Sequence, residues 1–154
     1  MNDTYKHKVL NWLSAIDYDS EQNVFFSQHQ KGTGRWFLES DNFQWWVQEP
    51  KRTLLCQGIS GAGKTIMISI VIHHLRTLFS HASDVGIAYA YCNFRQQREQ
   101  RFECIISSLL KQLCQQQSRM PECVVEAYDR FWVQRVYPSP EKLLVMLGTV
   151  IAFY

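Results

Sequence analysis

Residues 58–65 read Gly-Ile-Ser-Gly-Ala-Gly-Lys-Thr, which is the pattern of a phosphate-binding loop. This pattern constrains the fold because the loop works between a buried strand and the first turn of a helix. The flanking sequence fits, since residues 53–56 read as a short buried strand and residues 66–78 carry almost no charge, as in a helix packed against a sheet. The sequence therefore predicts a strand, a loop and a helix in that order.

The residue types in this loop suit phosphate chemistry. The three glycines allow backbone conformations that other residues avoid, so that successive N–H groups can turn toward phosphate oxygens. Lys64 would place its charge near the β- and γ-phosphates, the Thr65 hydroxyl suits Mg²⁺, and the helix N-terminus adds a partial positive charge. We expect ATP or GTP with Mg²⁺ as the ligand, bound by Gly58, Ser60, Gly61, Ala62, Gly63, Lys64, Thr65 and Ile66. The alternative is a glycine-rich turn followed by an incidental Lys-Thr pair.

Composition excludes several other classes of protein. With 154 residues, 46% of them hydrophobic, the chain can bury one full-sized core. The net charge of +2 is nearly neutral, and residues 95–101 include Glu99, so we interpret this segment as a solvated helix start and expect no nucleic-acid partner. Five cysteines lack the C-x-x-C spacing of zinc sites, which favours reduced core residues in a cytosolic protein.

Nothing in the sequence predicts contact with a membrane. Residues 1–8 are polar, unlike a secretory signal, and the longest apolar run, 143–154, is too short to span a bilayer. We therefore expect a soluble, cytoplasmic protein.

The rest of the chain predicts helices around a second strand. Short helices are expected at 6–13 and 21–30, and a third, capped by Ser40 or Asp41, runs toward Pro50. Residues 85–91 read as a second buried strand, and helices then follow from 102 to 113, from Pro121 toward 136, and after Ser139. The predicted fold class is α/β: a partial P-loop NTPase, with a parallel sheet flanked by helices, and an N-terminal helical preamble.

Several ordered segments resemble a known family. Residues 11–18, 32–38, 58–65, 85–94 and 107–113 together are similar to the nephrocystin-type N-terminal module, a member of the NACHT branch of signal-transducing (STAND) P-loop NTPases that precedes repeats in large fungal receptor-like proteins. The resemblance implies a helical preamble over 1–50 and the front of a NACHT-like domain over 51–154. It also implies a nucleotide-binding switch that has protein partners or self-associates.

The segment Gly32–Gly34 and its neighbours have two interpretations. The resemblance puts this segment beside the nucleotide base, with Thr33, Gly34 and Trp36 as contacts, and the two glycines would allow close backbone approach. Core packing is the other interpretation, and it is the one favoured for four further aromatic residues, Phe37, Phe43, Trp45 and Trp46.

One departure from the family bears on catalysis. A complete module continues into an apolar strand ending in acidic residues, which hold Mg²⁺ and position water. The second predicted strand ends instead in Cys92-Asn93, and no acidic residue follows Glu141. We therefore assign no catalytic residue and expect no hydrolysis from this chain, which reads as a truncated product or an incomplete gene model. A protein-interaction fragment that no longer binds nucleotide is the alternative; a P-loop kinase or GTPase fits less well, because no Asn-Lys-x-Asp guanine-reading segment occurs.

Overall fold

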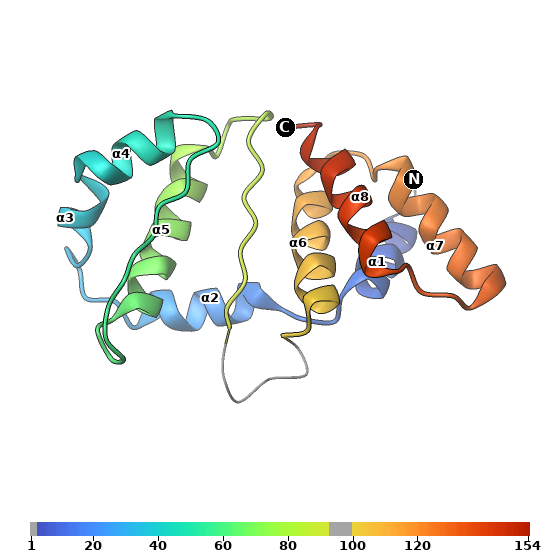
Figure 1. Cartoon of the computed structure of the whole chain (residues 1–154), viewed down its shortest axis with the longest axis horizontal. Coiled ribbons are helices and arrows are strands. Elements are labelled where there is room, and N and C mark those ends of the chain that lie inside the picture. Colours follow the sequence, from blue (N-terminus) through green and yellow to red (C-terminus); the bar gives the residue numbers. More distant parts are fainter. Residues whose placement is uncertain (1–2, 93–99) are drawn as a thin grey trace. The chain divides into compact units, whose positions relative to one another are not determined.

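The computed structural model describes residues 3–92 and 100–154. Within these ranges the regular secondary structure is entirely helical (Figure 1). The helices are α1 (Asp3–Leu13), α2 (Tyr18–Ser27), α3 (Arg35–Leu38), α4 (Asp41–Gln48), α5 (Lys64–Leu78), α6 (Phe102–Gln116), α7 (Glu122–Gln134) and α8 (Pro140–Ile151). The chain divides into two compact units, Asp19–Ser80 and the remainder, Met1–Tyr18 with His81–Tyr154. The predicted boundary between residues 50 and 51 stays a prediction.

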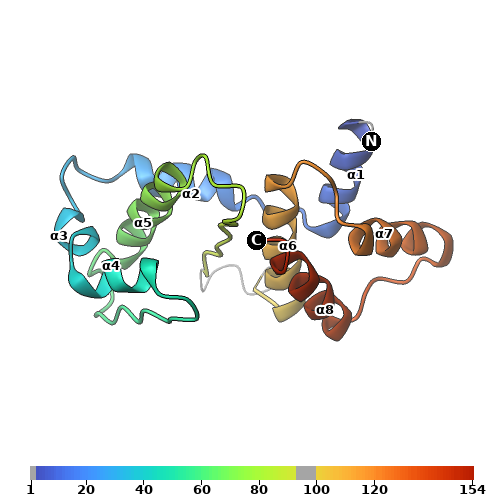
Figure 2. The same ribbon diagram turned by 90° about the horizontal axis from the view of Figure 1, so that it is seen from above.

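The unit formed by both ends of the chain is a helix cluster. Helices α6 and α8 lie side by side, and α1 and α7 pack beside them (Figures 1 and 2). The apolar stripe of α6 explains this, because its apolar residues recur every three or four positions and so share one face of the helix. The fully buried side chains at its centre come from four helices and are Val9, Leu110, Cys114, Val124, Leu143 and Val150.

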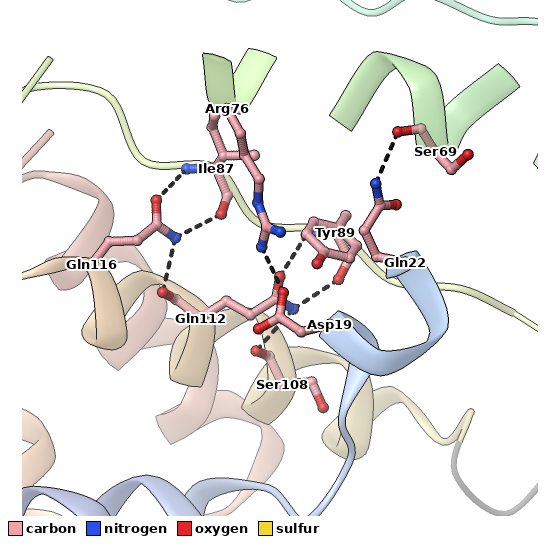
Figure 3. Close-up of polar contacts among 9 residues, drawn as sticks. All are labelled: Asp19, Gln22, Ser69, Arg76, Ile87, Tyr89, Ser108, Gln112 and Gln116. Atoms are coloured by element: carbon pink, nitrogen blue, oxygen red, sulfur yellow. Dashed lines mark hydrogen bonds and ion pairs between the residues drawn. The ribbon is translucent and has the colours of Figure 1, made fainter. Parts of the chain in front are cut away.

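The unit Asp19–Ser80 is built around α5. Phe43 of α4 is fully buried, and Ile70 and Ile72 of α5 are nearly so. Helix α2 is tied to α5 by polar contacts (Figure 3): the Gln22 amide donates to the Ser69 carbonyl at 2.8 Å, and Arg76 pairs with Asp19 at 2.6 Å. The ion pair is half-exposed and adds little stability, whereas the Gln22 bond is buried.

The predicted α/β fold with a parallel sheet is wrong for this structure. Both predicted strand segments, 53–56 and 85–91, lie outside the helices, but neither is paired as a strand within the described residues. The backbone of residues 53–57 makes no hydrogen bond to any other described residue. Apolar, β-prone sequence favours an extended backbone, but a sheet also requires a neighbouring strand, which local sequence does not supply.

The second segment is held by two glutamine side chains instead of a strand (Figure 3). The Gln112 amide accepts from the Tyr89 N–H at 3.2 Å and donates to the Tyr89 carbonyl at 2.8 Å. In the same way, the Gln116 amide accepts from the Ile87 N–H at 3.0 Å and donates to the Ile87 carbonyl at 2.7 Å. The spacing explains the match, because alternate residues of an extended chain are about 6.6 Å apart and residues four apart on a helix about 6 Å. The side of α6 that faces this segment therefore substitutes for a strand.

Most helix predictions are confirmed. The Ser40 hydroxyl accepts from the Phe43 N–H and so caps α4, and Ser139 caps α8 with Pro140 in its first turn. The predicted helix start at 95–101 lies mostly outside the described residues, and α6 begins at Phe102. The short helix α3 was not predicted.

The cysteine prediction is confirmed in part. None of the five cysteines, all within the described residues, is in a disulfide; Cys114 is buried and Cys104 and Cys123 are partly buried, as expected of core residues, but Cys56 and Cys92 are exposed. Among the described residues no helix has the length and apolar character needed to cross a membrane.

Candidate phosphate-binding loop

The loop between Gly58 and Gly63 leads directly into the 15-residue helix α5. Gly61 and Gly63 have φ angles of +79° and +80°, in the left-handed region that favours glycine. The Ala62 N–H donates to the Ile59 carbonyl at 3.2 Å and closes a tight turn. Every residue from 57 to 65 is exposed. The predicted glycines are thus placed in one accessible turn at the start of a helix.

The Lys64 side chain folds back over this turn. Its ammonium donates to the Gly58 carbonyl at 2.7 Å and to the Ile59 carbonyl at 2.8 Å. These bonds hold the positive charge of Lys64 against the backbone of Gly58 and Ile59, the first two residues of the loop. The lysine is exposed, so the same ammonium is accessible to a ligand.

The first turn of α5 has donors available. Gly63 is its N-cap and supplies no side-chain hydrogen bond, and the Met67 N–H is the first to bond to the Gly63 carbonyl, at 2.9 Å. The N–H groups of Lys64, Thr65 and Ile66 are left without an acceptor in the described part of the chain, as at most helix starts. Thr65 is exposed and Ile66 half-buried on this turn. Backbone donors and the Thr65 hydroxyl therefore belong to the same helical turn as Lys64.

The predicted base-contact segment lies against the same helix. Gly34 has a φ of +84° and begins α3, and a Cβ atom at this position would lie 3.2 Å from Met67 Sδ and 3.1 Å from Ile70 Cδ1. Thr33 is exposed, and Trp36 is 71% exposed, resting edge-on against Phe37. Glycine at 34 thus lets the backbone pack on α5 and leaves the Trp36 ring open to solvent.

Other side chains of the unit Asp19–Ser80 have structural partners. Arg35 pairs with Glu39 at 2.9 Å, Phe43 is core, and Arg52 lies over the Trp45 ring at 4.1 Å. His73 stacks on Phe26, as expected of a structural histidine. No three His, Cys, Asp or Glu side chains in the described ranges gather into a metal site. Thr65 is the one predicted metal ligand, and it would act together with a bound nucleotide.

Comparison with known proteins gives the family. Residues 32–149 match the family model described as nephrocystin 3, N-terminal, which is well over half of the chain. The chain belongs to this family. The nephrocystin part of the sequence resemblance is therefore confirmed. The loop and the segment beginning at Gly32 both lie inside the matched range, whereas α1 and α2 precede it. No curated protein and no solved structure matches the chain.

Sequence reasoning missed the glutamine pair on α6. The signal was present, because Gln112 and Gln116 are spaced four apart beside the apolar stripe of the helix. A buried amide at such a position needs partners, and the extended segment supplies them. These residues hold the fold of their own unit and are not part of the loop.

Proposed function

We propose that this chain is a nucleotide-binding module of a NACHT-type switch protein in the cytoplasm, and that residues 58–65 bind the phosphates of ATP or GTP with Mg²⁺. The observation that supports this most is the position of the Lys64 ammonium over a turn with two left-handed glycines at the start of α5. An anion in that turn would meet backbone N–H groups, the helix N-terminus and a full positive charge together.

Phosphate offers Lys64 a better partner than the carbonyls it now contacts. A phosphate oxygen carries negative charge and therefore attracts the Lys64 ammonium more strongly than a neutral carbonyl does. The Lys64 tip moves without disturbing buried structure because the residue is exposed. The Thr65 hydroxyl follows directly and would contact Mg²⁺ held by the phosphates. Trp36, whose ring is open to solvent, is the proposed contact for the base, together with Thr33 and with Gly34, which packs on α5.

We infer binding without turnover. Hydrolysis needs a metal held from both sides and an oriented water, and Thr65 supplies one ligand only. The sequence contains no apolar strand that ends in acidic residues. The proposed role is therefore to hold nucleotide as part of a larger switch.

A protein-interaction fragment that binds no nucleotide is the second candidate. The exposed apolar side chains beside the loop favour it, because Leu55 is 75% and Ile59 82% exposed. Both candidates are consistent with membership of the nephrocystin family, and a binding measurement separates them.

Calorimetric titration with Mg-ATP and Mg-GTP tests the proposal. We expect Lys64→Ala to weaken binding by about ten- to a hundredfold, the value of a charged hydrogen bond. Lys8→Ala is the control, since Lys8 is an exposed lysine on α1, in the unit that does not hold the loop, and it should leave affinity unchanged. No heat of binding with the unmodified chain, or equal affinity in Lys64→Ala, would favour the interaction fragment.

A further inference from the structure

The stretch between α4 and the loop is an open hydrogen-bonding surface. Residues 53–57 (Thr-Leu-Leu-Cys-Gln) run extended along their unit (Figure 1), and four of the five are exposed. None of their backbone groups is bonded within the described ranges. Extended backbone with free N–H and C=O groups is a template for pairing with another chain.

This stretch is held at both ends. Before it, Trp46 donates to the Arg52 carbonyl at 3.2 Å, and the Arg52 guanidinium lies 4.1 Å from the centre of the Trp45 ring. After it, Lys64 fixes the Gly58 and Ile59 carbonyls. Anchored ends lower the entropy that pairing would cost, because the free backbone between them spans only five residues.

The side chains indicate what can pair with it. Residues 53–57 carry no charge and include Leu55, which is 75% exposed, so an uncharged apolar strand fits. The same residues of a second copy meet both requirements. Parallel pairing in register would place Lys51 opposite Lys51 and Arg52 opposite Arg52, and like charges directly opposite destabilise a strand pair. Antiparallel pairing centred on Leu55 places Arg52 opposite Gly58 and avoids this.

We propose that two copies of the chain associate through residues 53–57, paired antiparallel about a twofold axis at Leu55. Leu55 then faces its own counterpart and Leu54 faces Cys56. This is an isologous contact, in which one patch serves both subunits. Five paired residues make a small interface, so the dimer is weak and forms with increasing concentration. The inference uses no nucleotide and does not rest on the proposed function.

Sedimentation of the 154-residue chain over a range of concentrations gives the first test. We expect a shift from monomer to dimer, and Leu55→Lys should raise the dimer dissociation constant at least about tenfold because two lysines would face each other. Leu78→Lys is the matched control: Leu78 is 54% exposed in the same unit but lies on α5, so dimerisation should be unchanged. A monomer at all concentrations, or equal loss in both variants, would overturn the proposal.

Disulfide formation tests the register independently, in chains where the exposed Cys92 is Ser. One chain keeps Cys56; the other carries Cys56→Ser and Leu54→Cys. Directly opposed residues lie about 4.5–5.5 Å apart between Cα atoms, within disulfide range, whereas two copies of Cys56 would be roughly 8 Å apart. We expect the mixture to form a cross-linked heterodimer and each chain alone to stay largely uncross-linked. Cross-linking of each chain with itself at the same rate would show that the predicted register is wrong.

Discussion

The side-chain amide of Gln112 makes both hydrogen bonds to the backbone of Tyr89 that a neighbouring strand would make. The two residues are 23 positions apart in sequence, and the contact is buried (Figure 3). Because the amide also donates to the Ser108 carbonyl at 3.3 Å, its orientation is fixed by three contacts.

Gln112→Leu should lower the free energy of unfolding by about 1–3 kcal/mol, because leucine fills the space but leaves both Tyr89 backbone groups unpaired. Gln115→Leu is the control, since Gln115 lies on the exposed side of the same helix. Urea unfolding of both variants measures the difference. Equal stability in the two would mean that water replaces the glutamine at no cost.

Two glycines should respond to alanine in opposite directions. A Cβ atom at Gly86 would lie 2.7 Å from Leu113 Cδ2 and 2.9 Å from Tyr154 Cε2, so Gly86→Ala forces repacking and should cost about 1–3 kcal/mol. Gly148 lies within α8 with open space around it, so Gly148→Ala should stabilise by about 0.5–1 kcal/mol. Thermal unfolding of the two variants shows whether each substitution raises or lowers the stability. Stabilisation by both substitutions would contradict the close packing of Tyr154 on Gly86.

Alkaline pH should weaken the helix cluster through Cys114. Burial raises the pKa of this thiol from 9.0 to about 12, with Cys123 nearby adding to the shift. Because the folded pKa is raised, the stabilisation is complete below pH 9 and is lost as the pH rises toward 12. Cys114→Ala should therefore show a shallower fall in unfolding free energy between pH 9 and 10 than the unmodified chain. An unchanged slope in Cys114→Ala would show that this thiol does not cause the loss of stability.

Trp36 provides a test of the base contact that spares the fold. The ring is 71% exposed, so Trp36→Ala should not affect stability, unlike substitution of Gly34, where a Cβ atom would crowd Ile70. We expect weaker binding of ATP but unchanged binding of inorganic triphosphate, which has no base. Trp132→Ala, at a half-exposed tryptophan of the other unit, is the control. Equal effects on the two ligands would leave Trp36 without a role in base binding.

The features that the sequence predicted correctly are those that depend on residues close together along the chain. Ser40 and Ser139 are followed by helices that need a cap, and the stripe of α6 has helical spacing, so these elements were found. The loop glycines also form a local pattern, and two of them have the left-handed backbone that glycine favours.

The sheet was predicted wrongly because strand pairing depends on distant partners. Leu55 was expected in a buried strand and is 75% exposed, since no neighbouring strand covers it among the described residues. Tyr89 is buried as expected, but its backbone partner is a side chain on α6, which hydrophobic pattern does not reveal. Base and metal contacts depend on a ligand and stay predictions.

Helix α6 contacts the core on one side and the extended segment on the other, and this affects how the unit opens. Leu110 and Leu113 pack in the core while Gln112 and Gln116 hold the extended segment, so a one-residue slip or rotation of this helix would break both sets of contacts at once. Opening of the segment and opening of the helix should therefore be one event. In hydrogen exchange, the amides of Ile87 and Tyr89 would then exchange at the rate of the central amides of α6, although they belong to no regular secondary structure.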